Sequence, residues 1–243
     1  MRISADYHTH TTYSDGRTSH EDNVRQAIKL GLKTIGIADH AWGHAFYGIK
    51  KDKLREIKQE IDRLKERFPE IRILLSIEAN ILGRSGQLDV TEEEMALFDV
   101  VQAGYHFGSK PSSFDDIVSH LINYLNRLFG LFKKTAIKRN TTALINAMKR
   151  YPFHILTHPG DKGPVDIVAV AEAAIKYNKL LEINQRHHYL TVEQLRLIRD
   201  MDVKLIIGSD AHRLEDIGQV ADCIQRVIDA GIDPVKVVNL RTI

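Results

Sequence analysis

Short runs of apolar residues alternate with amphipathic segments along the whole chain. Seven of these runs have the length and composition of buried strands. They cover residues 3–7, 33–38, 71–79, 98–103, 154–157, 179–183 and 203–207. A helical pattern separates each run from the next, so the sequence predicts an α/β protein whose parallel sheet is covered by helices. Closure into a barrel is the economical form of such a sheet.

The helical segments carry start and stop signals of their own. Thr18 and Glu21 have the spacing of a capping box, and Gly31 follows as the end of that first helix. Thr91 and Glu94 repeat the capping-box spacing ahead of the fourth strand. The helix before the third strand has one apolar stripe, made of Leu54, Ile57, Ile61, Leu64 and Phe68.

Composition narrows the class of protein. The chain has 243 residues, which suits one large domain whose core needs no disulfide. Lys and Arg number 34 against 32 Asp and Glu, and this near-balance argues against a dedicated binder of duplex nucleic acid. The single cysteine, Cys223, favours a reducing compartment. No apolar run approaches the about 18 residues of a membrane span, so we expect a cytoplasmic protein with no membrane partner.

Reactive side chains follow the predicted strands. A single histidine after a strand is usually a hydrogen-bonded loop residue, but the carboxyl ends of all strands in a parallel barrel open on one face. Six imidazoles and three carboxylates crowded there would repel one another and compete for protons unless cations held them. We therefore predict a metal centre. Its candidate ligands are His8, His10, Asp15, His40, Glu78, His106, His158, Asp210 and His212.

The ligand types narrow the metal and the substrate. Imidazole with carboxylate and no cysteine suits Zn, Mn or Fe and disfavours Ca²⁺ and Mg²⁺. Nine ligands are too many for one tetrahedral ion and are natural for two or three ions that share a carboxylate. The opening of the barrel on this face, which we call the mouth, would then keep a net positive charge. That charge favours a phosphate ester as substrate, attacked by a metal-bound hydroxide. The absence of a nucleophile elbow, a Walker loop and a Rossmann glycine motif agrees with this chemistry.

Eight short motifs follow one another along the chain. They are His8-Thr-His10-Thr, Ser14-Asp15-Gly16, Ala38-Asp39-His40, Ile77-Glu78-Ala79-Asn80, Gly104-Tyr105-His106, Thr157-His158-Pro159-Gly160, Leu181-Glu182-Ile183-Asn184 and Gly208-Ser209-Asp210-Ala211-His212. This ordered series resembles the PHP (polymerase and histidinol phosphatase) family over nearly the whole chain, and it is closest to the stand-alone bacterial phosphatases. Some family members carry His where Asp15 stands, which would alter affinity for one ion.

The resemblance implies a distorted TIM-like (β/α)7 barrel, with one PHP domain over residues 1–243 and three divalent metal ions as cofactors. One ion would take His8, His10, Glu78 and Asp210. The second would share Glu78 and add His106 and His158. The third would take Asp15, His40 and His212. Glu78, Asp210 and His212 would then serve catalysis through metal-activated water, with no protein nucleophile.

We therefore expect a metal-dependent phosphoesterase, most simply a phosphomonoesterase acting on a small phosphorylated metabolite. One alternative is a PHP-type nuclease or phosphodiesterase acting on single-stranded nucleic acid, and another is an amidohydrolase-type metal hydrolase. A third is a non-catalytic metal-binding or assembly module, which an intact ligand set disfavours. The sequence names neither the substrate nor the native metal, and it leaves the general acid open.

Several residues beside the ligands are candidates for supporting roles. Arg186 and Arg213 each lie one step beyond a mouth residue and could grip a phosphate oxygen, and Lys162 is a weaker case; a surface role is the alternative. His187 and His188 fit a general acid, a substrate contact or a solvated loop pair. Asp39 could orient His40 or another ligand imidazole. We expect His20, His44, His120 and His154 to be structural.

A helical insertion is expected at about 112–138, with breaks near Gly130 and Lys138. Its apolar positions have helical spacing and comprise Ile117, Leu121, Leu125, Leu128 and Phe129. They predict either a helix packed on the barrel or a lid or subunit contact beside the mouth, because the segment leaves and re-enters next to His106. Association into a homo-oligomer stays open. The charges at Lys133–Arg139 are typical of a solvated face, so a nucleic-acid partner is not expected.

Overall fold

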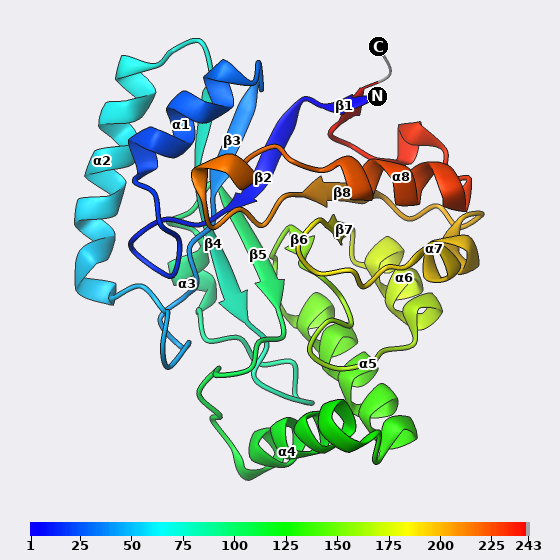
Figure 1. The fold of residues 1–243 in the computed structure, drawn as a ribbon. Helices are drawn as coiled ribbons and strands as arrows, with labels where there is room; N and C mark the ends of the chain where they lie inside the picture. The colour runs from blue at the N-terminus through cyan, green and yellow to red at the C-terminus, as the bar shows by residue number, and fades with distance from the viewer. Residues whose placement is uncertain (242–243) are drawn as a thin grey trace.

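The computed structural model describes residues 1–241 and contains seven parallel strands in the order in which they occur along the chain (Figure 1). Helices surround them, which confirms the predicted TIM-like barrel class. The strands are β2 (Ala5–Thr9), β3 (Thr34–Ile37), β4 (Arg72–Asn80), β5 (Val100–Gly104), β6 (Ile155–Leu156), β7 (Leu180–Asn184) and β8 (Leu205–Gly208).

The barrel closes where the first strand meets the segment after the last. The backbone N–H of His10 donates to the carbonyl of Ala211 at 2.8 Å, and the N–H of Ala211 donates to the carbonyl of His8 at 3.2 Å. Behind this closure, β1 (Arg2–Ile3) pairs antiparallel with β9 (Leu240–Arg241). The run predicted as one strand over 3–7 is therefore two strands, separated at Ser4, whose N–H and hydroxyl both donate to the carbonyl of Asn239.

Helices cover the outside of the barrel (Figure 1). They are α1 (His20–Lys29), α2 (Leu54–Arg67), α3 (Glu92–Met95), α4 (Phe114–Phe129), α5 (Lys133–Arg150), α6 (Ile167–Lys176), α7 (Val192–Ile198) and α8 (Ala221–Ala230), with 3₁₀ turns at Lys51–Lys53, Leu214–Asp216 and Pro234–Lys236. The capping box of Thr91 and Glu94 is confirmed. That of the first helix lies one residue later than predicted, at Ser19 and Asp22. Over residues 1–241, no helix has the length and apolar character to cross a membrane.

Alternation along the strands separates the core from the mouth. On β4 and β7, Ile77 and Ile183 are fully buried in the apolar core. Their neighbours Glu78 and Glu182 contact the histidines of the mouth instead. Successive side chains of a strand point to opposite faces, so the same short segments supply both stability and chemistry.

The predicted insertion differs from the structure in two ways. The break near Gly130 is confirmed, since Gly130 ends α4 in the left-handed conformation. The break near Lys138 is wrong, because α5 runs unbroken from Lys133 to Arg150 with Ala136 and Asn140 buried on one face. The interpretation of α4 as a helix with its apolar side on the barrel is also wrong, because Ile117, Leu121, Leu128 and Phe129 are exposed.

Candidate metal centre

The nine candidate ligands converge at the carboxyl ends of the strands, around the buried carboxylate of Glu78. Its Oε1 lies 3.0 Å from His158 Nε2 and 3.2 Å from His106 Nε2. Its Oε2 lies 3.0 Å from His40 Nδ1. Residues from β4 and from three different loops therefore meet on one carboxylate, as the strand-end pattern predicts.

Two further carboxylates gather the remaining candidates. Asp210 Oδ1 lies 3.3 Å from His10 Nε2 and 3.4 Å from His212 Nδ1. Asp15 Oδ1 lies 3.2 Å from His212 Nε2 and 3.6 Å from His40 Nε2. The three carboxylates share their histidine neighbours, so the nine side chains form one continuous cluster.

The donor atoms fit bound cations. The outer nitrogens of two rings are already used, since His8 Nδ1 donates to Glu182 at 2.7 Å and His106 Nδ1 donates to Asn80 at 2.9 Å. Their Nε2 atoms therefore point inward, where His8 Nε2 lies 3.1 Å from His10 Nε2, and each can ligate a cation once it carries no proton.

Other polar atoms crowded together in the same cluster also fit bound cations. His106 Nε2 lies 3.2 Å from His158 Nε2. Glu78 Oε2 and His40 Nδ1 are buried 3.0 Å apart without forming a well-aligned hydrogen bond. Buried polar atoms crowded together in this way are unfavourable on their own, and bound metal ions would satisfy them.

Four sets of ligand atoms are close enough to hold an ion, with all atoms of a set within 4.8 Å of one another. The sets are His10 with Asp15, His40 and His212; His8 with His10 and Asp210; His40 with Glu78 and His106; and His158 with His187 and Asp210. Eight of the predicted residues group much as the family resemblance implies. His187 was not among the predicted ligands.

Glu182 organises the cluster from outside, and its role was missed in the sequence. Its Oε1 accepts the bond from His8, while its Oε2 accepts from the His158 backbone N–H at 3.0 Å and from Asn184 Nδ2 at 2.9 Å. Gly208 permits this approach, because a Cβ there would lie 2.0 Å from Glu182 Oε1. The available signal was the acidic residue ending a strand, the position that Glu78 also has.

Two candidate ligands adopt left-handed backbone conformations, His158 with φ 28° and Asp210 with φ 54°. Residues other than glycine rarely adopt such angles, and they persist where the surroundings enforce them. Asp210 and His212 therefore do not lie on an extended segment, although both side chains reach the cluster. The Glu182 bond to the His158 N–H helps to hold one of these turns.

Burial and the carboxylates set the protonation of the cluster. Burial lowers the pKa of His106 to about 3 and, with the nearby His40, that of His10 to about 4. Burial alone would lower the pKa of His8, but Glu182, Glu78 and Asp210 outweigh it and raise that pKa well above its usual value. Burial would likewise raise the pKa of Glu78, but the surrounding histidines bring it well below the usual range.

Cationic side chains line the opening of the cluster. Lys162 and Arg186 border a cavity of about 150 Å³ that contains the cluster. Arg186 also borders a wider adjoining groove of about 580 Å³, together with Arg213 and with Arg17, which the sequence analysis did not single out. Lys162 forms an ion pair with Asp161, and Arg213 lies 3.9 Å from Glu215.

The structure shows the surroundings of three further histidines, His187, His188 and His44. His187 lies inside the site, 3.4 Å from Asp210 Oδ2 and 3.1 Å from Asp161 Oδ2, so it is not a solvated loop residue. His188 is exposed, as a solvated residue would be. His44 is not merely structural in its position, since its ring stacks on His40 with centroids 5.2 Å apart.

The side chain of Asp39 does not hydrogen-bond to His40, so the interpretation that it orients that ring is wrong. It accepts bonds from the Thr11 N–H at 2.7 Å and from the Ser14 hydroxyl at 2.5 Å. It therefore fixes the loop that carries Asp15. The side chain of Asp39 is directed there because Thr11 and Ser14 offer three donors within reach, including the Thr11 hydroxyl.

Fold and site together define a metal-binding α/β barrel protein. The family model described as PHP domain matches residues 6–190 of the chain. The chain therefore belongs to the PHP domain family, as the motif series predicted.

Comparison with individual proteins agrees. A "probable phosphatase" of Caldanaerobacter subterraneus subsp. tengcongensis is 30% identical over 98% of this chain and 88% of its own length. The DNA polymerase/3'-5' exonuclease PolX of Bacillus subtilis is 29% identical over 100% of this chain, which corresponds to 40% of PolX. The structure of histidinol phosphate phosphatase from Lactococcus lactis, complexed with Zn, L-histidinol and phosphate, has a TM-score of 0.64 at 18% identity and covers 95% of both chains. That structural likeness supports the fold.

Proposed function

We propose that this protein is a metal-dependent phosphomonoesterase that hydrolyses a small phosphorylated metabolite at a trinuclear centre. The observation that carries the proposal is the nine-residue cluster around Glu78, opening into a groove lined by arginines. Membership of the PHP family and relatives named as probable phosphatases support the same chemistry.

Three sites can be assigned to the residues present. His8, His10, Glu78 and Asp210 would hold one ion, and Glu78 with His106 and His158 would hold a second. Asp15, His40 and His212 would hold the third. Zn, Mn or Fe suits these donors, and such ions supply Lewis-acid activation of water and of the phosphoryl group.

The chain's own side chains would orient and bind. Glu78 would contribute to two of these sites, because its Oε2 lies 3.8 Å from His10 Nε2 and its Oε1 lies 3.0 Å from His158 Nε2. Glu182 and Asn80 fix the rings of His8 and His106 from behind, so that Nε2 faces the substrate side. Asp210 and His212 would complete the catalytic set, because both line the cavity and Asp210 Oδ1 lies 3.4 Å from His212 Nδ1.

Arg186, Arg213 and Lys162 would bind the anionic substrate. Arginine suits phosphate because its planar guanidinium can donate two parallel hydrogen bonds. The small cavity would take the phosphoryl group, and the adjoining groove would take the rest of the substrate. A single groove of this size accommodates a small metabolite better than a polymer.

A nuclease is the second candidate, because the relative PolX carries the name of a 3'-5' exonuclease. Its substrate would be single-stranded nucleic acid, whose repeated phosphates would extend past the groove. An amidohydrolase-type reaction has less support, since the chain belongs to a different family.

A phosphate-release screen with metal analysis tests the proposal. Protein loaded separately with Zn, Mn and Fe is assayed on phosphorylated metabolites, p-nitrophenyl phosphate and single-stranded oligonucleotides, alongside His106→Ala and the surface control His188→Ala. We expect three ions per chain, turnover of a metabolite, loss of turnover in His106→Ala and full activity in His188→Ala. Full activity after chelation, or cleavage of oligonucleotides alone, would reject the phosphomonoesterase.

A further inference from the structure

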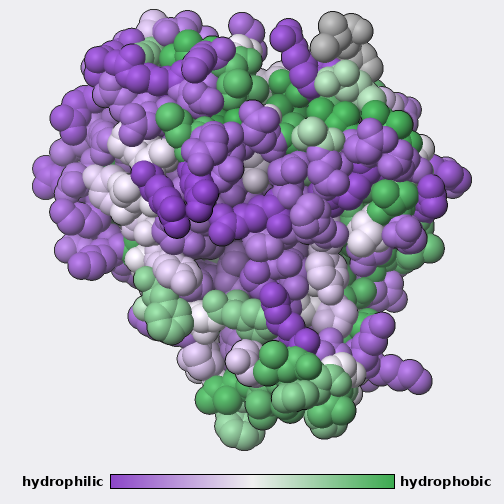
Figure 2. Space-filling view, viewed as in Figure 1, coloured by the Kyte–Doolittle hydropathy of each residue, from purple (hydrophilic) through white to green (hydrophobic). Residues whose placement is uncertain are grey.

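The helix α4 presents its apolar side to solvent. Phe114 is 79% exposed and Leu121 is 55% exposed, and other large apolar residues continue the patch into the turn before α5. Figure 2 shows hydrophobic residues gathered over α4 on a surface that is otherwise largely polar. The members of this patch are Phe114, Ile117, Leu121, Tyr124, Leu128, Phe129, Leu131 and Phe132, each between 49% and 79% exposed.

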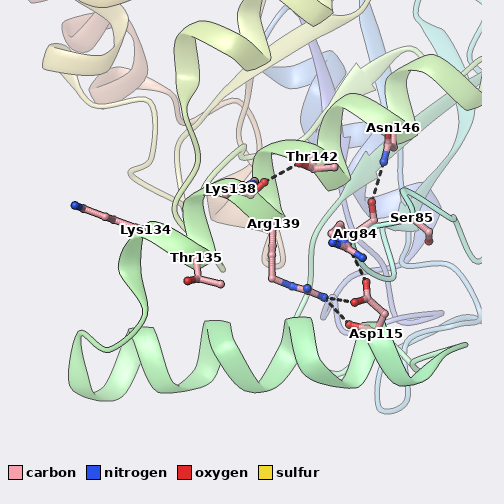
Figure 3. Close-up of a pocket in the computed structure, with 9 residues that line it drawn as sticks. All are labelled: Arg84, Ser85, Asp115, Lys134, Thr135, Lys138, Arg139, Thr142 and Asn146. Carbon is pink, nitrogen blue, oxygen red and sulfur yellow. Dashed lines mark hydrogen bonds and ion pairs between the residues drawn. The ribbon is translucent and has the colours of Figure 1, made fainter.

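Specific polar contacts fix this orientation. The buried side of α4 carries Asp116, Ser119 and Asn123. Asn123 and Asn140 of α5 exchange two hydrogen bonds, both 2.8 Å long. Arg139 of α5 donates to Ser119 Oγ at 2.8 Å and to Asp115 Oδ1 at 2.7 Å, and Figure 3 shows it reaching down to α4. Turning the apolar side inward would break these buried bonds, so the chain is built to keep that side outward.

The pattern within the patch is that of a helix–helix seam. Phe114, Ile117, Leu121, Tyr124 and Leu128 follow one another at alternating intervals of three and four, which is the a and d spacing of a coiled coil. At roughly 200 Å² for a whole large apolar residue, the exposed parts of the patch amount to roughly 930 Å². That exceeds the about 300–600 Å² of the largest patch on a typical monomer and matches the about 800 Å² that each partner buries in a standard interface.

We propose that α4 is the dimer interface of this protein, packed antiparallel against α4 of a second copy about a two-fold axis near Leu121. A seam centred on Leu121 is complementary to itself, because Phe114 and Leu128 lie seven residues on either side of it and face each other in the antiparallel pair. Antiparallel packing also sets opposite ends of the two helix dipoles side by side.

Charge placement suits this partner. No acidic residue lies on the seam, and the positions flanking it carry one charge, Arg127, whose guanidinium lies 5.5 Å from the ring of Phe107 of its own chain. The seam therefore buries no unpaired carboxylate. Phe107 lines the metal-site cavity, so the dimer would brace one side of the mouth of each copy.

Sedimentation velocity on the full chain over a micromolar concentration series tests the proposal. Leu121→Glu sets two carboxylates against each other at the axis and should raise the dimer dissociation constant at least ~100-fold, because like charges brought together in an interface are strongly unfavourable. Leu197→Glu is the matched control, since Leu197 is an exposed leucine on α7 outside the patch. It should dimerise like the wild type. A monomeric wild type, or an unaffected Leu121→Glu dimer, would overturn the proposal.

Disulfide trapping covers the case in which Leu121→Glu does not fold. Leu121→Cys should form a covalent dimer under mild oxidation, and Leu197→Cys should not; the native Cys223 is fully buried and leaves the background silent. Absence of the Leu121→Cys disulfide would overturn the dimer. So would a monomer that binds phosphatidylcholine–phosphatidylserine vesicles through the patch, because a lipid surface would then be its partner.

Discussion

The substitution Glu182→Gln tests how the metal cluster is held in place. Glu182 is fully enclosed and accepts three bonds, from His8 Nδ1, the His158 N–H and Asn184 Nδ2. A glutamine fills the same space but has one oxygen and one NH₂ group. At least one of the three donors must then face another donor, and a buried unpaired donor costs ~1–3 kcal/mol.

The fate of His8 decides the functional effect. If the glutamine NH₂ turns toward His8 Nδ1, the proton of the ring moves to Nε2 and that ligand is lost. If the oxygen stays on His8, the turn at His158 loses its acceptor instead. Either outcome removes one properly oriented ligand, so we expect metal affinity and turnover to fall about 10–100-fold, the usual effect of changing the partner of a metal-bound histidine.

The assay pairs metal competition with a folding control. Dissociation constants come from titration against a chromophoric chelator, kcat comes from phosphate release, and circular dichroism follows thermal unfolding. Glu172→Gln, at an exposed position on α6, is the matched control and should behave as the wild type. A folded Glu182→Gln protein that keeps metal affinity and kcat within about twofold would refute the orienting role, because the change expected from losing such a partner is larger.

Three further predictions follow from the same contacts. The carboxylates that outweigh burial raise the pKa of His40 and His158, so metal must displace protons from the metal-free protein, and metal affinity should rise as pH increases above about 6.5. Calorimetry in buffers of different ionisation enthalpy should show this proton release, and identical enthalpies would contradict it. Gly208→Ala brings a Cβ against Glu182 and should destabilise the fold by ~1–3 kcal/mol in denaturant unfolding, and an unchanged midpoint would count against that contact. Burial raises the pKa of the Cys223 thiol to about 12, so a thiol reagent should react with it only on unfolding; rapid labelling of native protein would show otherwise.

The strand ends and the convergence of the nine residues could be predicted because parallel strands leave little choice. Apolar runs mark strands, and a carboxyl-terminal residue such as Glu78 or His106 must then face the shared mouth. His8 and His10 are two residues apart in an extended segment, which puts both side chains on one side of it, and their Nε2 atoms lie 3.1 Å apart.

What escaped prediction depends on contacts between distant segments. His187 enters the site because its loop folds over Asp161 and Asp210, which no local pattern records. Glu182 became a hub through its three donors, two of which come from other segments of the chain.

The orientation of α4 was missed for a similar reason. Helical periodicity defines a stripe but not the direction in which it points. Here the pairing of Asn123 with Asn140, seventeen residues apart, turns the stripe outward.

The hydrogen bonds that join His8 and His10 to Ala211 have a consequence for biogenesis. The cluster draws on residues near both extremes of the sequence, so it cannot assemble on a ribosome until β8 has been translated and released from the exit tunnel. Any ion taken up earlier would be held by an incomplete ligand set. A polypeptide that ends before β8 would thus lack Asp210 and His212 and would leave the cell with a half-built, unselective metal chelator instead of the complete cluster.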